Sequence, residues 1–262
     1  MVNVGREQSS THSRGHVSGS PDGRVHSSAR GRQAMFVDRI HAGRLLAGNL
    51  QQYVGDPNVA VMSISRGGAV IGSVIAEALG ADIPHIFYLV RPIPCASLPR
   101  LSLGSVAGDG SVRLDNMVAK SLGLDMSQVL DGIAEIDARL RSEQMQFERP
   151  IPSPESLAGK TLLVVDDGME AGDMMREAIM HLRHCYAAGA IVVAVPVCLA
   201  DLRKQLKRHV ECVVDVVSSV CVGSVARWYE RGVRASGDER RVLQRLFVGP
   251  SSSRRRSGFD FE

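Results

Sequence analysis

The stretch that decides the fold is Leu162-Leu163-Val164-Val165-Asp166-Asp167-Gly168-Met169-Glu170-Ala171-Gly172-Asp173-Met174. Its apolar first half has the length of a strand and ends in two adjacent carboxylates, Asp166 and Asp167. After a turn that contains two glycines, the spacing of apolar residues becomes helical. In an open α/β sheet, ligands bind beyond the carboxyl ends of the strands, where helix N-termini present unpaired N–H groups. The order therefore predicts an anion-binding turn, with a plain solvated turn as the alternative.

The residue types in this turn supply complementary chemistry. The carboxylates of Asp166 and Asp167 can hold ribose hydroxyls or, through water, a divalent metal. Gly168 and Gly172 permit backbone conformations that direct several N–H groups at one phosphate. The turn is therefore suited to a phosphorylated sugar.

A second turn of the same kind lies earlier in the chain. Ser65-Arg66-Gly67-Gly68 follows an apolar run and precedes a helical stretch. A guanidinium donates in a fork, and adjacent glycines let backbone amides approach, so this turn suits a pyrophosphate. Taken alone, an R-G-G turn is more typical of a surface arginine beside a tight bend.

The remaining pattern alternates strands with helices, which predicts an α/β fold with a mostly parallel sheet flanked by helices. Strands are expected at 59–64, 86–90, 161–165, 190–195 and 211–217. Helices are expected over 37–53, 66–79, 126–148, 173–187 and 200–208, with Asp125 as an N-cap and Pro150 as a stop. Residues 91–114 read as irregular or hairpin-like because they contain Pro92, Pro94, Pro99 and several glycines.

Composition narrows the classes of function. The 262 residues carry a formal charge of only +3, and much of the excess lies near the ends, so a specific nucleic-acid surface is not indicated. Five cysteines form no C-x-x-C pair, which favours reduced thiols in a cytoplasmic protein over disulfides or zinc. No apolar run is long enough to span a membrane. The P-loop, G-x-G-x-x-G and G-x-S-x-G patterns are also absent from the sequence.

The two ends differ in composition from the rest. Residues 1–34 and 250–262 are polar and poor in residues that a core could bury, so we expect disordered tails around a domain at 35–249. Met35 opens the apolar pattern and is an alternative initiator to Met1; the intact mass of the native protein tests this.

With these motifs in order, residues 35–246 resemble the type I phosphoribosyltransferases, and in particular a bacterial-type group with a divergent donor loop. Further segments that carry the resemblance are Ile86–Arg91, Leu103–Val106, Val193–Val197 and Arg227–Glu230. The resemblance implies a small irregular hood region and transfer of 5-phosphoribosyl from phosphoribosyl diphosphate (PRPP) to a nitrogenous base, with Mg²⁺. Asp166 and Asp167 would be the catalytic, metal-binding acids. The 5′-phosphate would bind at Gly168, Met169, Glu170, Ala171, Gly172, Asp173 and Met174, and pyrophosphate at Arg66, Gly67, Gly68 and Arg91.

The loop departs from the family at several positions. Ala171 and Met174 stand where Thr or Ser hydroxyls are usual, while Glu170 and Asp173 add negative charge. Two lost hydrogen bonds to a charged group would weaken phosphate binding by roughly 3–6 kcal/mol if nothing replaces them. Pro92 replaces a usual Lys, and Arg100 could restore that charge from another position. The alternative function is therefore a degenerate member that binds PRPP or a nucleotide as a sensor.

The acceptor side is less defined. Trp228 and Tyr229 could stack on an acceptor ring, although a single Trp is more often a core anchor. His181 and His184 lie three residues apart on an expected helix and, with no third ligand, read as surface residues. Homodimers are common in the family, but this sequence gives no independent sign of one, and the acceptor base cannot be read from it.

Overall fold

The computed structural model of the protein describes residues 35–95, 97–147, 149–169, 173–221, 223–232 and 234–247. The expected tails, 1–34 and 250–262, lie outside the described residues, as do Glu170, Ala171 and Gly172 and the side chain of Arg100. The predictions that concern those residues are not tested by the structure.

Five parallel strands form the central sheet, as the alternating pattern predicted. Their order is β2 (His85–Phe87), β1 (Val59–Ser63), β6 (Thr161–Val165), β7 (Ala190–Leu199) and β8 (Cys212–Ser219). The central strands β1 and β6 are apolar except for Ser63 and Thr161 at their ends, because helices cover both faces of the sheet. Ser63 of β1 pairs with Val165 of β6, so the carboxyl ends of these two strands lie level with each other.

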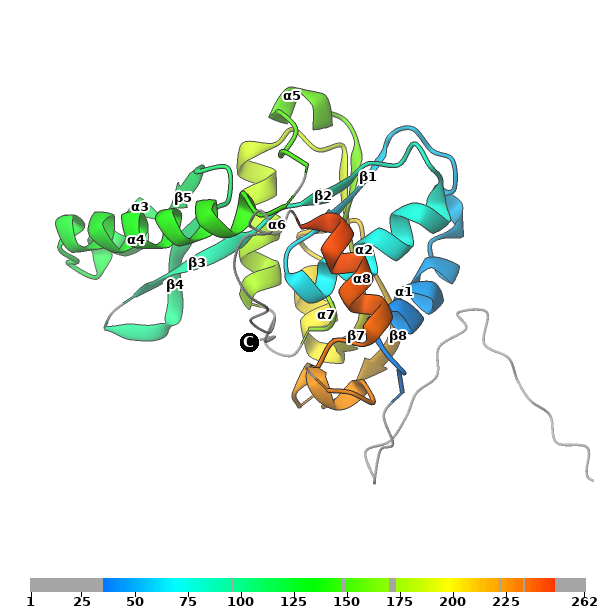
Figure 1. Ribbon diagram of the computed structural model, residues 1–262. Helices are drawn as coiled ribbons and strands as arrows, with labels where there is room; N and C mark the ends of the chain where they lie inside the picture. Colours follow the sequence, from blue (N-terminus) through cyan, green and yellow to red (C-terminus); the bar gives the residue numbers. More distant parts are fainter. Residues whose placement is uncertain are drawn as a thin grey trace, which may run out of the picture.

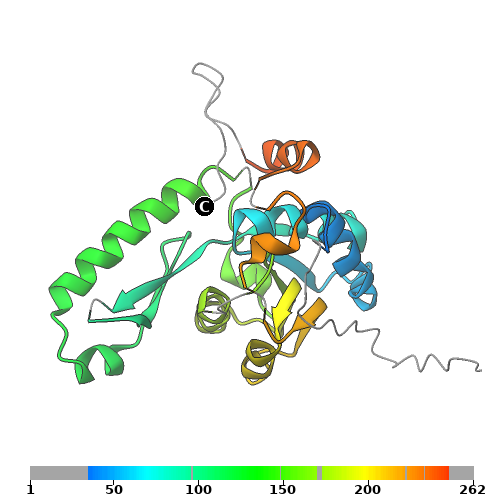
Figure 2. The same ribbon diagram turned by 90° about the horizontal axis from the view of Figure 1, so that it is seen from below.

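Alternate residues of the strands pack into two separate cores, one on each face. On one face, Met62 and Val164 pack with α6 (Asp173–Cys185) and α7 (Ala200–Leu206). On the other face, Val61 and Leu163 pack with α1 (Arg39–Gly48) and α2 (Arg66–Leu79), and the two helical layers are separate in Figure 2. The C-terminal α8 (Gly237–Leu246) packs against α2 and α1. Two 3₁₀ turns, Gln51–Tyr53 and Val225–Trp228, and α5 (Pro154–Leu157) complete this part of the chain.

An arm, defined here as residues 90–144, projects from the sheet (Figure 1). It contains the antiparallel strands β3 (Val90–Cys95), β4 (Leu98–Ala107) and β5 (Val112–Leu114), then α3 (Asn116–Ser121) and α4 (Met126–Gln144). The predicted strand at 86–90 is therefore divided between two sheets. Of the two descriptions expected for 91–114, irregular or hairpin-like, the structure shows the second, because these residues form an antiparallel sheet that is backed by a 19-residue helix.

The prolines and glycines of the arm lie where an antiparallel sheet tolerates them. Pro92 and Pro94 lie on β3, an edge strand that pairs only with β4, where a missing N–H costs least. Gly104 has φ +147, and a Cβ there would stand 1.9 Å from the Arg113 carbonyl oxygen, so this glycine lets β4 and β5 approach closely.

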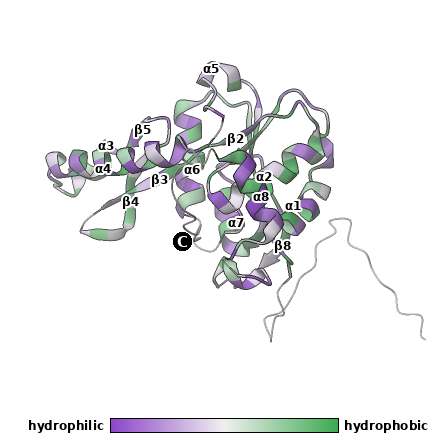
Figure 3. Ribbon diagram, viewed as in Figure 1, coloured by the Kyte–Doolittle hydropathy of each residue, from purple (hydrophilic) through white to green (hydrophobic). Residues whose placement is uncertain are grey.

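The prediction for α4 was confirmed. The carboxylate of Asp125 caps its N-terminus by accepting from the Ser127 N–H, and Ile133 and Leu140 are buried against the arm. Figure 3 shows hydrophilic and hydrophobic residues alternating along α4, as expected of a helix with one buried side. Among the helices that the structure describes, none has both the length and the apolar character needed to cross a bilayer.

Candidate functional site

The two turns singled out in the sequence lie in contact at the carboxyl edge of the sheet. Ser65–Gly68 follows β1, and Asp166–Gly168 follows the neighbouring strand β6. A Cβ on Gly68 would stand 2.7 Å from the Val165 carbonyl oxygen and 3.0 Å from the Cα of Asp166. Only glycine therefore lets the start of α2 approach the end of β6 this closely.

Ser65 links the two turns through its hydroxyl. Its Oγ caps α2 by accepting from the Gly68 N–H at 2.9 Å, and its own proton is donated to Asp166 Oδ1. The Asp167 N–H donates to the same oxygen at 2.8 Å. Burial and the neighbouring charge of Asp167 raise the pKa of the Asp166 carboxyl to about 7. The hydrogen bonds from Ser65 and from the Asp167 N–H both fall on Oδ1 of Asp166.

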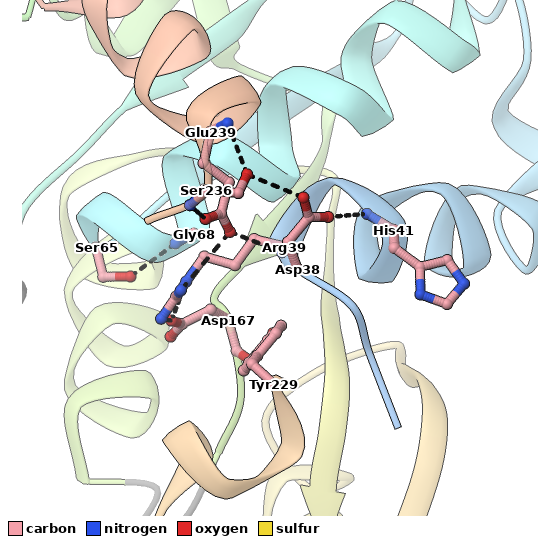
Figure 4. A network of polar contacts seen from close by, with 9 residues as sticks. All are labelled: Asp38, Arg39, His41, Ser65, Gly68, Asp167, Tyr229, Ser236 and Glu239. Atoms are coloured by element: carbon pink, nitrogen blue, oxygen red, sulfur yellow. Dashed lines mark hydrogen bonds and ion pairs between the residues drawn. The ribbon is translucent and has the colours of Figure 1, made fainter. Parts of the chain in front are cut away.

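The carboxylate of Asp167 is held by Arg39, a residue that the sequence analysis did not assign to the site. Nε and Nη2 of Arg39 both lie 2.7 Å from Asp167 Oδ2 (Figure 4). The Arg39 side chain is 4% exposed and that of Asp167 is 20% exposed. A Cβ on Gly67 would stand 2.2 Å from the same carboxylate oxygen. Gly67 therefore makes room for an internal ion pair.

A second acid completes the surroundings of Arg39. Glu239, which is 1% exposed, accepts from the Arg39 backbone N–H at 2.7 Å, and its Oε1 lies 3.7 Å from Nη1. Burial alone would lower the pKa of Arg39, but Asp167 and Glu239 outweigh it and raise that pKa above its ordinary value. Glu239 also forms a capping box with Ser236 at the start of α8. Asp167 is thus linked through Arg39 and Glu239 to α1 and α8, the first and last helices of the fold.

Two sequence signals could have found this cluster. Arg39 is a charged residue on the buried stripe of α1, whose other members include Ala42, Gly43 and Leu46. Ser236 and Glu239 have the three-residue spacing of a capping box. Neither signal identifies Asp167 as the partner of Arg39, because Asp167 lies 128 residues away in sequence.

The predicted 5′-phosphate residues are only partly described. Met169 is buried and its N–H donates to the Val197 carbonyl at 3.0 Å, so this amide is already used within the fold. That finding corrects the assignment of Met169 to phosphate binding. Asp173 is 60% exposed and lies 3.6 Å from Arg176, so its charge is open to solvent and beside a cation. Met174 packs against the core, as its apolar side chain requires.

Gly168 has little space around it. A Cβ there would stand 2.8 Å from both methyl groups of Val225, in the turn that leads to Trp228 and Tyr229. A side chain at this position would therefore displace that turn. The turn that follows Asp167 is therefore packed at Gly168 against Val225, in the C-terminal part of the chain.

The two arginines predicted to bind pyrophosphate are brought together by a third residue, Glu143. Nε of Arg66 lies 3.2 Å from Glu143 Oε1, and Nη2 of Arg91 lies 3.6 Å from Oε2. Glu143 belongs to the last turn of α4, so the arm contributes to this edge of the sheet. Sequence reasoning missed Glu143 because nothing in the pattern of the arm places it beside α2.

Trp228 and Tyr229 do not present rings to an acceptor. They are 4% and 3% exposed and belong to the core that includes Phe36. The hydroxyl of Tyr229 donates to the Asp167 carbonyl at 2.6 Å, and Arg39 lies 4.8 Å from the centroid of its ring. The prediction that these residues could stack on an acceptor ring is therefore corrected. They pack in the core, and Tyr229 contacts the backbone of Asp167.

His181 was also misplaced by the sequence analysis. It is fully buried, with Nδ1 3.0 Å from Ser105 Oγ and Nε2 2.8 Å from Ser111 Oγ. Both serines lie in the antiparallel strands of the arm or their connection. The prediction failed because the periodicity of α6 was judged against the central sheet alone, whereas the arm covers another side of this helix.

The carboxylates at this site are compatible with one way of binding Mg²⁺, in which the protein supplies only part of the coordination shell. Among the described residues, no cluster of three or more His, Cys, Asp or Glu side chains is arranged to hold a metal. Mg²⁺ commonly takes one or two carboxylates and completes its shell with water and substrate phosphates. Asp166 and Asp167 fit that arrangement, because the contacts described above fall on a single oxygen of each carboxylate.

Comparison with solved structures identifies similar folds. The chain is similar to the protein TT1426 of Thermus thermophilus. The two are 26% identical, the TM-score is 0.67, and the match covers 81% of this chain and 99% of that one. No protein-family model matches the sequence.

Two further matches are much weaker. A hypoxanthine phosphoribosyltransferase from Staphylococcus aureus is 12% identical with a TM-score of 0.43, over 74% of this chain and 79% of its own. A purine phosphoribosyltransferase from Pyrococcus horikoshii is 16% identical with a TM-score of 0.39, over 76% and 94%. At these scores the matches carry no argument about the function of this chain.

Proposed function

We propose that the protein is a phosphoribosyltransferase that moves 5-phosphoribosyl from PRPP to a nitrogenous base and releases pyrophosphate. The observation that carries the proposal is the contact between the acid-pair turn and the Ser65–Gly68 turn at the carboxyl edge of neighbouring parallel strands. This is the edge at which an open α/β sheet binds ligands, and the resemblance of the sequence to type I phosphoribosyltransferases implies that both turns bind the donor.

In the proposed reaction, a base nitrogen forms a bond to C1 of the ribose while the bond from C1 to the pyrophosphate oxygen breaks. Pyrophosphate departs with the bonding electrons, and the proton on the attacking nitrogen passes to water. The sugar becomes oxocarbenium-like, so catalysis depends on electrostatic stabilisation rather than on a side-chain nucleophile. Oδ2 of Asp166 is the acceptor for a ribose hydroxyl, because its other oxygen is taken by Ser65 and the Asp167 N–H.

Positioning of the second acid is the task of Arg39. A hydrogen bond from Nε and an ion-pair contact from Nη2 to one oxygen fix the Asp167 carboxylate and orient its other oxygen. Mg²⁺, held by these acids through water and by the donor, would offset negative charge on the departing pyrophosphate. Arg66 and Arg91 supply the remaining positive charge at this edge.

The alternative is a sensor that binds PRPP or a nucleotide without turnover. It is favoured by the Arg39–Asp167 ion pair, which commits part of the acid pair to the fold, and by Met174, which packs inward and offers no hydroxyl. The exposed position of Asp173 favours the transferase, because its charge would not oppose the phosphate directly.

Two measurements separate these functions. Calorimetry with PRPP and Mg²⁺ measures binding, and release of pyrophosphate across a panel of purine and pyrimidine bases measures turnover. Base-dependent release supports the transferase. Binding with no release on any base supports the sensor, and the absence of binding eliminates both.

A further inference from the structure

One carboxylate of the arm lies between two guanidinium groups from different elements. Glu143, on α4, faces Arg66 of α2 with Oε1 at 3.2 Å and Arg91 of β3 with Oε2 at 3.6 Å. Each oxygen is thus directed at a different arginine. Two oxygens of a pyrophosphate could satisfy the same pair of cations, since guanidinium groups bind carboxylates and phosphates with similar geometry.

The three side chains are accessible from solution. Arg66, Arg91 and Glu143 are 29%, 34% and 28% exposed. Ion pairs at this exposure are weak, because water competes for both partners. A doubly or triply charged anion in solution would therefore compete with a single carboxylate for these arginines.

The partners of Glu143 leave its side chain able to move. The hydrogen bonds and ion pairs of this side chain within the described residues are those with the two arginines. Arg66 is also placed by Gln146, whose Oε1 lies 2.9 Å from Nη2, and by the Phe247 ring, 5.2 Å from its guanidinium carbon. Displacement of Glu143 would therefore leave Arg66 oriented at the end of α4.

We propose that Glu143 is an internal competitor for the arginines that bind pyrophosphate, and that it swings out when a pyrophosphate-bearing ligand arrives. The proposal rests on the proposed function for the identity of the ligand, and it assigns a regulatory role to the arm at that same site. The affinity for pyrophosphate would then depend on the free energy needed to move the Glu143 side chain away from Arg66 and Arg91.

The test is a calorimetric titration of inorganic pyrophosphate at constant ionic strength. Glu143→Gln removes the competing charge and keeps the shape, so its affinity should rise about three- to tenfold over that of the wild type. Glu135→Gln is the matched control, since Glu135 lies on the same helix and pairs with the exposed Arg139. In the Glu143→Gln background, Arg66→Gln should remove the gain.

Three results would overturn the proposal: an unchanged or weaker affinity in Glu143→Gln, an equal gain in Glu135→Gln, or a gain that persists without Arg66. This titration does not depend on turnover. A gain in Glu143→Gln with no transferase activity on any base would support the competitor and reject the proposed transferase. Transferase activity of the wild type, with no gain in pyrophosphate affinity in Glu143→Gln, would support the proposed transferase and reject the competitor.

Discussion

Arg39 and Asp167, which are 128 residues apart in sequence, form a nearly buried ion pair in which Nε and Nη2 both lie 2.7 Å from one carboxylate oxygen. The pair joins α1 to the turn after β6, and Glu239 joins it to α8. Its geometry explains why Gly67 cannot carry a side chain, because a Cβ would stand 2.2 Å from that oxygen. The same contact thus has a structural role and sets the orientation of a predicted catalytic acid.

Removal of Arg39 should strongly destabilise the fold. Arg39→Met keeps an unbranched apolar stem in place of the aliphatic part of the side chain but leaves the Asp167 and Glu239 carboxylates without their cation. Breaking a buried pair costs about 3–5 kcal/mol, and the lower end, about 3 kcal/mol, applies because Asp167 is one-fifth exposed. The free energy of unfolding in urea measures this change.

A matched control lies on the same helix. Arg44 is exposed on α1, so Arg44→Met should change the unfolding free energy by less than about 0.5 kcal/mol. Equal stabilities for Arg39→Met and the wild type would show that the ion pair does not hold the acid in solution.

Substitution of Gly67 should disturb the acid pair directly. In Gly67→Ala, the new methyl group would overlap Asp167 Oδ2 and lie 2.9 Å from Nε of Arg39. Overpacking of this kind typically costs about 1–3 kcal/mol, and the displaced carboxylate should weaken PRPP binding. Thermal unfolding and calorimetry with PRPP measure the two effects.

Gly132 provides the opposite case. It lies within α4, and nothing stands within 4 Å of a Cβ built there. Gly132→Ala should therefore stabilise the protein by about 0.5–1 kcal/mol through helix propensity and leave donor binding unchanged. A destabilised Gly132→Ala would mean that α4 is not a regular helix at this point.

The central sheet was accessible from the sequence because its information is local. The strand at Thr161–Val165 and the helix ending at Leu79 follow from apolar periodicity and from glycines at their ends. In the arm, α4 was predicted, but residues 91–114 were expected only as an irregular or hairpin-like region, since Pro92 and Pro94 indicate a break unless the strand is known to lie at an edge. A single sequence carries no signal for that position.

The residues of the candidate site likewise fall into those that the sequence predicts and those that it does not. The acid pair and Arg66 were found because each directly follows a strand that the sequence predicts. Arg39 and Glu143 were missed because their roles arise from tertiary contacts with residues that are distant in sequence, 128 positions for Arg39 and Asp167 and 77 for Glu143 and Arg66. Charged side chains on amphipathic helices are normally solvated, so periodicity alone assigns them to the surface.

Two buried histidines should make stability depend on pH. Burial lowers the pKa of both His85 and His181 to about 4, from an ordinary value of 6.5. Each side chain is neutral in the fold but binds a proton more readily when unfolded. Stability is therefore fully present above about pH 6.5 and decreases as the pH falls toward 4, by at most about 3 kcal/mol for each histidine.

Urea unfolding at a series of pH values between 7 and 4 measures this dependence. His181 lies near Asp109 and Arg113, which act in opposite directions on its pKa, so its share should be compared with a variant that cannot titrate. His181→Asn should be less stable at pH 7 but should lose less stability on acidification. Parallel curves for His181→Asn and the wild type would show that this histidine titrates normally in the fold.

Asp167→Asn tests the acid pair in the transferase reaction. The change keeps the shape of the side chain but removes the charge that faces Arg39 and the donor sugar, so turnover should fall at least tenfold, or about 1.4 kcal/mol in the activation barrier. Asp201→Asn is the control, since Asp201 on α7 is 78% exposed and pairs with the exposed Lys204, and its turnover should stay within about twofold of the wild type. Both variants must be assayed below their unfolding temperatures, because Asp167→Asn also weakens the contact with Arg39. A folded Asp167→Asn variant that turns over PRPP at the wild-type rate would remove this carboxylate from the catalytic site.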